Sequence, residues 1–182
     1  SVIKDDAGMY KCVARSRDSQ DQHSAQLIAL VPPTIVRLDN ATADEGTQGV
    51  ITCTAYGEPI PTIKWQKKGS DLEFAEGSQQ DNSNIIVSHK KRQETMENIG
   101  TLTITNLKSN DAGFYVCKAE NEAKPVEKEV YLTVQYKPNF SKVKQDVIYS
   151  WGGQSTPIQC IASSVPTANI TWFRGEQQIN AG

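Results

Sequence analysis

Hydrophobic and polar residues alternate in several short segments of this chain, which is the pattern of a β-strand with one buried face. No segment shows the wider spacing of an amphipathic helix over an extended stretch. The residues on the hydrophobic side of each alternating segment are Ile51, Cys53 and Ala55; Ile63 and Trp65; Leu102 and Ile104; Tyr115, Cys117 and Ala119; and Val130, Leu132 and Val134. Many short alternating strands separated by turns predict an all-β sandwich.

Two motifs recur along the chain. The octet DDAGMYKC at residues 5–12 returns as NDAGFYVC at residues 110–117, which indicates a structural unit of about 105 residues. A cysteine and a tryptophan at one fixed spacing also occur twice, as Cys53 with Trp65 and as Cys160 with Trp172. The chain is therefore expected to contain repeated copies of one domain type.

The middle of the chain has the cysteine and tryptophan spacing of an immunoglobulin domain. In such a domain a disulfide joins the two facing sheets, and the tryptophan packs against it. The cysteines here would be Cys53 and Cys117, with Trp65 between them. Tyr115 matches the tyrosine corner of that fold, because it lies two residues before the second cysteine. The core signature expected across the chain is Tyr10, Trp65, Tyr115 and Trp172.

The repeat predicts one complete domain and parts of two others. Residues 32–134 form the complete domain. Residues 1–31 supply the last two strands, F and G, of a preceding domain, and residues 135–182 supply strands A to C of a following one. Cys12 and Cys160 are expected to bond to cysteines outside this sequence. We interpret the chain as a fragment of a longer tandem array.

The expected junctions between these domains are short and contain proline. Residues 30–34 (LVPPT) and 134–140 (VQYKPNF) contain no glycine, so successive domains are expected to lie end to end with restricted bending. Residues 69–98 are polar and charged, and we expect an edge region with a surface loop there. Its basic cluster, HKKR at residues 89–92, is either a polyanion site or a solvated part of that loop. The glutamates that follow the cluster favour the solvated loop.

Composition and charge limit the function classes. The chain has 182 residues, of which 37% are hydrophobic and 22% charged, as in an ordinary globular protein. Its net charge of −2 gives no reason to expect nucleic-acid binding or attraction to an anionic membrane. No apolar run has the length of a membrane span, and the first residues lack the regions of a signal peptide. Such segments can lie outside this sequence.

The sequence shows no catalytic or metal-binding constellation. The two histidines, His23 and His89, fall in different repeats, and neither has a cysteine or carboxylate at metal-ligand spacing. Asp6 and Asp111 occupy equivalent positions of different repeats, so they cannot form one site. We expect Asp111 to form an ion pair with Arg92 near strand D. No enzyme activity, cofactor or metal is predicted.

Three Asn-x-Ser/Thr triplets predict N-glycosylation, at Asn40, Asn139 and Asn169. Asn169 is expected on the outward face of strand C. Glycans of this kind indicate an extracellular chain, in which a disulfide persists. They favour a disulfide between Cys53 and Cys117 over the alternative of two buried thiols in a cytosolic domain.

These motifs resemble the I-set immunoglobulin domains of neural cell adhesion molecules, the family that includes insect fasciclin II. The resemblance covers the whole chain. The segments behind it are TLTITNLKSNDAGFYVCKAENEA at residues 101–123, YKPNFS at 136–141, SWGGQ at 150–154 and IPT at 60–62. It implies tandem I-set immunoglobulin-like β-sandwiches in the outer part of a receptor, followed by fibronectin-type domains and a membrane anchor.

The resemblance also implies a function in neural cell–cell adhesion and in axon guidance or fasciculation. The chain would lie outside the cell and bind a protein partner, a like molecule on a facing membrane or another surface protein. Candidate contact residues are Lys64, Gln66 and Lys118 on the outward side of strands C and F, or the loop at residues 77–98. Two alternatives stay open: a ligand-binding ectodomain of a signalling receptor such as a receptor tyrosine kinase, and an intracellular muscle-type array.

Overall fold

The computed structural model of the protein describes residues 2–79, 84–140 and 147–179. Within these residues the regular structure consists of β-strands and two short 3₁₀ helices, η1 (Lys4–Asp6) and η2 (Ser109–Asp111). The strands are β1 Gly8–Arg15, β2 Gln20–Leu27, β3 Val31–Leu38, β4 Ala41–Asp44, β5 Gly49–Glu58, β6 Thr62–Lys67, β7 Glu73–Phe74, β8 Gly77–Ser78, β9 Ile85–Arg92, β10 Glu97–Ile104, β11 Gly113–Glu120, β12 Pro125–Asn139, β13 Ser163–Val165, β14 Trp172–Arg174 and β15 Gln177–Ile179.

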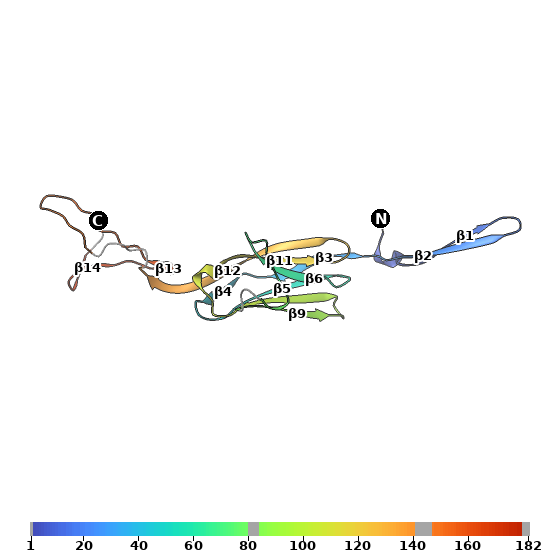
Figure 1. Cartoon of the computed structure of the whole chain (residues 1–182), viewed down its shortest axis with the longest axis horizontal. Coiled ribbons are helices and arrows are strands. Elements are labelled where there is room, and N and C mark those ends of the chain that lie inside the picture. Colours follow the sequence, from blue (N-terminus) through green and yellow to red (C-terminus); the bar gives the residue numbers. More distant parts are fainter. Residues whose placement is uncertain (1, 80–83, 141–146, 180–182) are drawn as a thin grey trace.

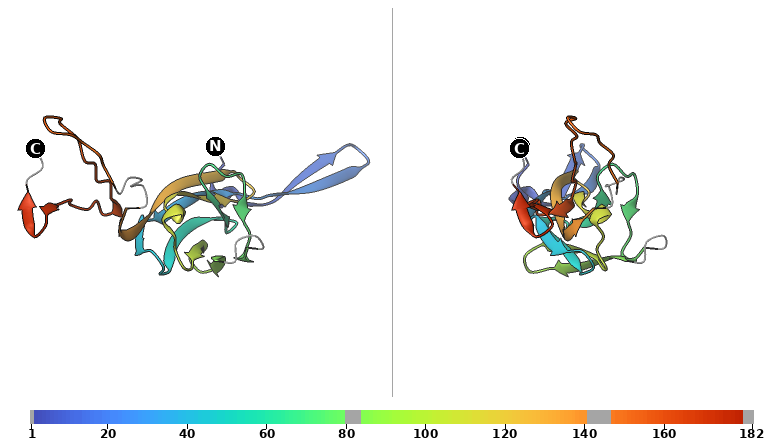
Figure 2. Two further views of the ribbon diagram at one scale, coloured as in Figure 1. Left: turned by 60° about the vertical axis from the view of Figure 1, so that its left-hand side comes forward. Right: turned by 90° about the vertical axis from the view of Figure 1, so that its left-hand side faces the viewer.

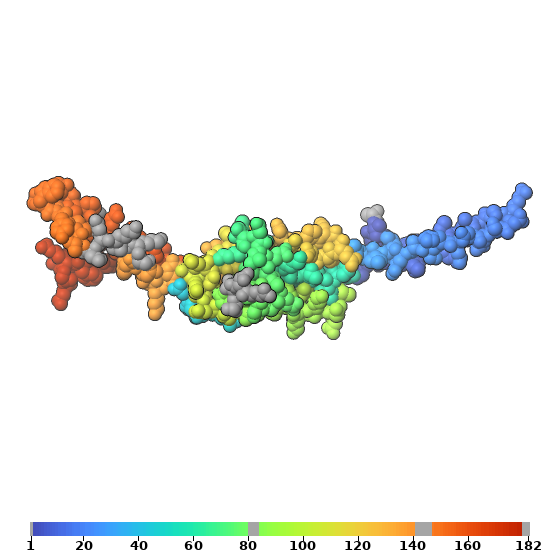
Figure 3. Space-filling model, viewed as in Figure 1, coloured from blue at the N-terminus to red at the C-terminus, as the bar shows by residue number. Residues whose placement is uncertain are grey.

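The molecule is elongated, with a β-sandwich at its centre. The hairpin of β1 and β2 projects from one end of the sandwich, and the segment from β13 to β15 projects from the other (Figure 1, Figure 2). The space-filling view shows the same three parts in a row, with the bulk of the atoms in the central one (Figure 3).

Two sheets form the central sandwich. One contains β3, β5, β10, β9 and β8 in that order, and the other contains β13, β12, β11, β6 and β7. β4 pairs in parallel with β12 and so adds to the second sheet. Because β5 and β6 lie in different sheets, the chain crosses from one layer to the other, as in immunoglobulin sandwiches. The prediction of an all-β sandwich is confirmed.

The core between the sheets follows the predicted alternation. Every residue assigned above to the hydrophobic side of an alternating segment is buried here. Residues that complete the core are Ile35, Phe74, Ile85, Val87 and Leu107. Burying an aliphatic or aromatic side chain of this size contributes about 1.5–3 kcal/mol, so the shared interior of the two sheets is the main source of stability.

A disulfide crosses this core. The sulfur atoms of Cys53 on β5 and Cys117 on β11 are bonded, and the two Cα atoms lie 6.5 Å apart. Trp65 on β6 lies directly opposite Cys117 in the antiparallel register, and all three side chains are fully buried. The bridge therefore joins one sheet to the other under an indole ring, as the spacing predicted.

Gly100 on β10 permits a close approach of the two sheets. It lies opposite Cys53 in the register with β5. A Cβ atom at this position would lie 2.6 Å from Cγ2 of Ile63 on the facing sheet. The missing side chain therefore lets Ile63 pack directly against the backbone of β10, beside the disulfide.

The repeated octet forms the same local turn in both places. In each copy the aspartate carboxylate accepts a main-chain N–H from three residues earlier, at 2.8 Å for both Asp6 and Asp111. The tyrosine hydroxyl donates to the carbonyl of the same aspartate, at 2.7 Å for Tyr10 and 2.8 Å for Tyr115. The octet thus encodes a 3₁₀ turn followed by a strand.

The surface loop expected within residues 69–98 is shorter than predicted. Residues 85–92 form β9, which pairs with β10 along its whole length. Ile85 and Val87 of this strand are buried in the core, because the alternation continues into the segment that was expected to be a loop. Residues 80–83 of the polar stretch lie outside the described residues.

The core signature is buried only in the central sandwich. Tyr10 is 55% exposed and Trp172 is partly exposed, and their place in the core of a complete domain stays a prediction. The physical reason for their exposure is that β1–β2 and β14–β15 are separate two-stranded sheets, and neither has a facing layer within the described residues. The strand expected around Cys160 is also absent, since β13 begins three residues later.

The strands continue through both expected junctions. β3 begins at Val31 and includes both prolines of the first junction. The side-chain amide of Asn121 donates to the Val31 carbonyl at 2.9 Å. β12 extends to Asn139, and its residue Tyr136 pairs with Val165 of β13. The junction residues are therefore held by sheet hydrogen bonds rather than forming free linkers.

Candidate protein interaction surface

The outer face of the second sheet presents charged and aromatic side chains to solvent. We call it the β6–β11–β12 face. Its outward residues include Lys64 and Gln66 on β6; Phe114, Val116, Lys118 and Glu120 on β11; and Glu127, Glu129 and Tyr131 on β12. They face outward because they alternate with buried residues such as Trp65 and Cys117. All three residues predicted on strands C and F lie on this one face.

Four charged side chains form a network at one end of this face. Nζ of Lys64 lies 2.8 Å from Glu120 and 3.4 Å from Glu73. Nζ of Lys118 lies 3.6 Å from Glu120 and 3.9 Å from Glu73. The hydrogen bond from Lys64 lowers the pKa of Glu120, and the same bond raises the pKa of Lys64. The network therefore holds two positive and two negative charges in alternation.

Gln66 has a local role. Its side-chain amide donates to the main-chain carbonyl of Ser70, beyond the end of β6. This contact fixes the turn that follows the strand. Gln66 thus supports the surface beside the charge network rather than pairing with it.

An exposed aromatic pair lies at the other end of the face. Phe114 and Tyr131 are opposite each other across β11 and β12, with ring centroids 4.9 Å apart in an edge-to-face arrangement. They remain 47% and 37% exposed. Nζ of Lys68 lies 5.2 Å from the Phe114 centroid and 2.8 Å from Glu129. The edge-to-face contact and the nearby cation fix the positions of the two rings. Their exposed surface can be buried by a partner protein.

Sequence reasoning missed Phe114, Tyr131, Glu73 and Glu120 as members of this surface. The available signal was the alternation itself, because Phe114 precedes the inward Tyr115 and must point outward. The cross-strand partner of Phe114 depends on the register of β11 with β12. That register could not be read from the sequence.

The three predicted glycosylation sites lie on the surface. Asn40, Asn139 and Asn169 are all exposed. Oδ1 of Asn40 accepts the main-chain N–H of Tyr131 at 2.9 Å, which orients the side chain beside β12. Asn169 precedes β14 instead of lying within a strand, so its expected place on strand C is wrong. Ser141, the third residue of the Asn139 triplet, lies outside the described residues.

The basic cluster lies on β9 and not in a loop. Lys90 and Arg92 point to the outer face of the first sheet, and Arg92 pairs with Glu97 at 3.9 Å. The expected ion pair of Arg92 with Asp111 is wrong, because the two residues lie at opposite ends of β10. The first and last of the eight residues of β10 lie roughly 23 Å apart, at about 3.3 Å for each step along the strand.

The described residues contain no group of three or more His, Cys, Asp or Glu side chains placed to hold a metal ion. Within the same residues, no helix has the length and apolarity needed to cross a bilayer.

The fold and the exposed face define a disulfide-linked immunoglobulin-type sandwich with a surface suited to protein recognition. Residues 32–134 match the sequence profile of the immunoglobulin I-set domain, and the chain belongs to that family. It is related to cell adhesion molecules. Fasciclin-2 of Schistocerca americana is 29% identical to this chain over an alignment of 185 positions. The alignment covers 97% of this chain and 21% of that protein.

A second relative and a solved structure agree with this assignment. Neural cell adhesion molecule 1 of Mus musculus is 31% identical over 179 residues, which cover 97% of this chain and 15% of that protein. The chain thus spans about a fifth or less of the length of these relatives. An I-band fragment of titin superimposes with a TM-score of 0.63 at 25% identity, over 100% of this chain and 60% of that one.

Proposed function

We propose that this chain is an extracellular part of a neural cell adhesion receptor that binds a like molecule on a facing membrane. The relatives named for cell adhesion support the class of function. In this proposal the receptor mediates homophilic contact between neural cells and so serves axon guidance or fasciculation. The partner is a protein, and the membrane anchor belongs to another part of the receptor.

The observation behind homophily is that charges of both signs are interspersed on the β6–β11–β12 face. Its charge network contains Lys64 and Lys118 against Glu73 and Glu120, and its other ion pair joins Lys68 to Glu129. Glu127 lies opposite Lys118 on the same face. Lysines and glutamates are therefore interspersed there, and a two-fold contact between two copies can place lysines of one opposite glutamates of the other. The exposed Phe114–Tyr131 pair supplies the aromatic contact area that interface centres favour.

The flanking segments are proposed to be parts of neighbouring immunoglobulin domains. Residues 1–31 would contribute strands F and G, and residues 135–182 would contribute strands A to C. The continuation of β3 and β12 through the junctions supports a tandem with restricted bending. In such an array weak contacts of single domains add along the cell junction.

The extracellular location is supported by the disulfide and by the three exposed triplets. A disulfide persists in an oxidising compartment. We propose N-glycans at Asn40, Asn139 and Asn169. Removal of N-glycans from the secreted protein in heavy-oxygen water converts each modified asparagine to labelled aspartate, which a peptide mass spectrum detects. Absence of the label at all three positions would contradict the glycan proposal.

Bead aggregation tests the adhesive face. Beads coated with the chain are expected to cluster, and the Phe114→Lys variant is expected to abolish clustering. Val50→Lys is the matched control, because Val50 is 46% exposed on the outer face of the other sheet. If beads coated with folded wild-type protein stay dispersed, the proposal of homophilic binding is wrong. Equal clustering by the Phe114→Lys variant would reject this face.

A further inference from the structure

An open groove crosses the outer face of the first sheet of the sandwich. Its sides come from the end of β3 with the turn to β4 and from β9 and β10, and its floor comes from β5 and β10. We call it the sheet groove, and its volume is about 610 Å³. Ligand pockets have volumes of about 300–1,000 Å³, so the sheet groove can hold a small organic group.

The floor of the sheet groove is uncharged and partly apolar. Val50, Thr52 and Thr54 follow one another on the outer side of β5, and Ile99 of β10 lies opposite Thr54. Val50 is 46% exposed, and Val36 at the side of the sheet groove is 54% exposed. The floor from Val50 to Thr54 is roughly 13 Å long, at about 3.3 Å for each step along the strand. Aliphatic groups that lie open to water beside hydroxyls favour cover by a group with both apolar and polar sides.

The charged residues at the sides of the sheet groove compensate each other. Arg37 pairs with Asp39 at 2.9 Å, and Arg92 pairs with Glu97 at 3.9 Å. The described lining therefore has no net charge. An anionic occupant would meet the two carboxylates, and a cationic one would meet the two guanidinium groups. The electrostatics thus favour a neutral occupant, to which the same groups offer hydrogen-bond donors and acceptors.

Asn40, one of the predicted glycosylation sites, lies at the side of the sheet groove. Its Oδ1 accepts the main-chain N–H of Tyr131 at 2.9 Å. An N-glycan is attached through the amide nitrogen Nδ2, so Oδ1 can accept the same hydrogen bond after modification. In that reaction Nδ2 loses one proton and bonds to C1 of the first sugar, while the lipid diphosphate that carried the sugar leaves. The bond to Tyr131 thus orients the amide group before and after modification, and a glycan on Asn40 begins at the sheet groove.

We propose that the first sugars of an N-glycan on Asn40 lie in the sheet groove. This inference rests on the proposed glycosylation of Asn40. A neutral sugar ring has C–H groups on its faces and hydroxyls at its rim. The C–H groups would pack on Val36, Val50 and Ile99, and the hydroxyls would exchange hydrogen bonds with the threonines of the floor. Because the glycan is attached beside the sheet groove, its effective concentration there is high, and weak contacts are sufficient to hold it.

The two outer faces of the sandwich then have different roles. Sugar would cover β5 and β10 on the first sheet, where its bulk excludes a protein partner. The β6–β11–β12 face would remain open for recognition.

The test uses the secreted 182-residue chain with Asn139→Gln and Asn169→Gln, which leaves Asn40 as its one glycosylation triplet. Valine and isoleucine methyl groups are labelled with carbon-13. Nuclear Overhauser contacts are expected between protons of the first sugars and the methyl groups of Val50 and Ile99.

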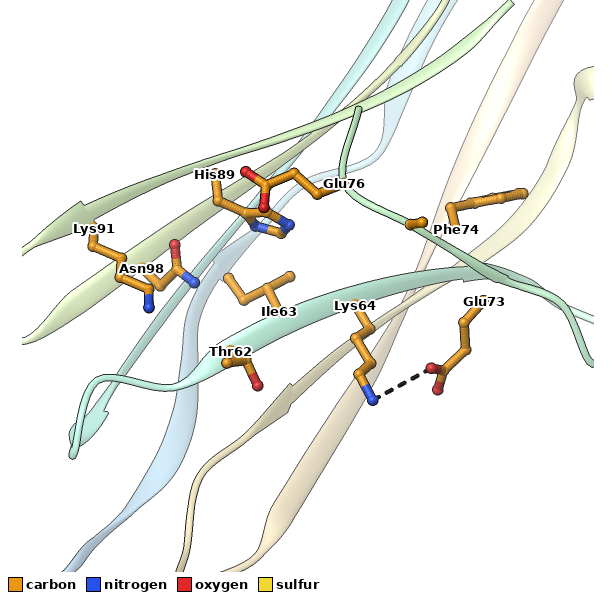
Figure 4. Close-up of a pocket in the computed structure, with 10 residues that line it drawn as sticks. Thr62, Ile63, Lys64, Glu73, Phe74, Glu76, His89, Lys91 and Asn98 are labelled. Atoms are coloured by element: carbon orange, nitrogen blue, oxygen red, sulfur yellow. Dashed lines mark ion pairs between the residues drawn. The ribbon is translucent and has the colours of Figure 1, made fainter. Parts of the chain in front are cut away.

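Ile63 is the internal control for these contacts. It lines a different cleft, between β6 and β7 of one sheet and β9 and β10 of the other, which also holds the Lys64–Glu73 ion pair (Figure 4). Its methyl groups carry the same label and should show no contact with sugar.

Thermal unfolding supplies a second measurement. Thr42→Ala removes the triplet but keeps Asn40 and its bond to Tyr131, and the glycosylated chain is expected to unfold about 4 °C above this variant. The increase should fall by about half in the Val50→Thr background, because the floor becomes less apolar. Ile86→Thr is the matched control, since Ile86 is 37% exposed on the same outer face but does not line the sheet groove.

The outcomes separate the modification from the placement of its sugars. A mass spectrum that shows Asn40 unmodified would overturn both. A glycan on Asn40 without contacts to Val50 and Ile99, or with equal increases in unfolding temperature in all backgrounds, would overturn the placement alone. Homophilic adhesion is tested separately by the bead experiment.

Discussion

The hydroxyl of Tyr115 donates a hydrogen bond to the main-chain carbonyl of Asp111, 2.8 Å away and four residues earlier. Tyr10 makes the same bond to Asp6 at 2.7 Å, although Tyr10 is 55% exposed and Tyr115 is 1% exposed. The bond is therefore local and forms with or without burial of the ring. Its contribution to stability should differ between the two positions.

We predict that Tyr115→Phe lowers the free energy of unfolding of the central sandwich by about 1 kcal/mol, the net value of one hydrogen bond. Burial raises the pKa of Tyr115, so the hydroxyl remains a donor throughout the neutral range. Tyr10→Phe is the matched control and should change the free energy by less than about 0.5 kcal/mol. Urea unfolding followed by tryptophan fluorescence measures both. Equal losses at the two positions would contradict the assignment of the bond to the central core.

We predict that Gly100→Ala destabilises the central sandwich by about 1–3 kcal/mol, as overpacked cores do. The added Cβ would meet Cγ2 of Ile63 at 2.6 Å and its Cβ at 3.1 Å, and a β-branched side chain cannot swing away. Gly152→Ala is the control, because nothing lies within 4 Å of a Cβ there. The same urea experiment compares them, and an unchanged midpoint for Gly100→Ala would show that the sheets are less closely packed.

The alternation of hydrophobic residues was sufficient to predict the core of the central sandwich. It placed Ile51, Leu102 and Val130 on buried faces, and the structure agrees at every such position. The same rule failed around Cys160, because a strand needs a neighbour to pair with and no strand pairs with that segment in the described residues. The alternation of residues shows which side chains a strand can bury. It does not show whether a neighbouring strand pairs with it.

The candidate site was less predictable than the core. Lys64 and Lys118 could be placed outward by alternation, but their partners Glu73 and Glu120 depend on the pairing of β6 with β7 and β11. The basic residues 89–92 masked the strand β9, whose buried residues Ile85 and Val87 alternate with the exposed Ile86 and Ser88.

We predict that replacing both Cys53 and Cys117 by alanine lowers the free energy of unfolding by about 4 kcal/mol. The disulfide spans 64 residues, and closing a loop of that length restricts the unfolded chain by about this amount. Cys12→Ala is the control, since Cys12 is exposed and bonded to no described cysteine. Chemical unfolding under non-reducing conditions measures both variants. A loss below about 1 kcal/mol for the double variant would contradict a stabilising role for the bridge.

We predict an acid-side loss of stability that depends on Lys64. The pKa of Glu120 lies below its ordinary value of 4.5, chiefly through the hydrogen bond from Lys64. Because the folded pKa is the lower one, this stabilisation is fully present above about pH 4.5 and is lost as the pH falls through the folded pKa. Lys64→Met should raise the pKa of Glu120 and flatten this part of the pH profile.

An NMR titration of the Glu120 carboxyl carbon measures that change. Lys68→Met is the control, because Lys68 pairs with Glu129 and should leave the Glu120 titration unchanged. A Glu120 pKa that is the same in the wild type and in Lys64→Met would show that the ion pair does not persist in solution.

One disulfide joins the two sheets of the central sandwich, and we propose that this sandwich lies outside the cell. The most direct measurement is to alkylate the protein as cells produce it, without reduction, and to map the digested peptides by mass spectrometry. We expect one peptide pair linked through Cys53 and Cys117, with neither thiol alkylated. Recovery of both cysteines as separate alkylated peptides would contradict it and would favour an intracellular array with reduced thiols.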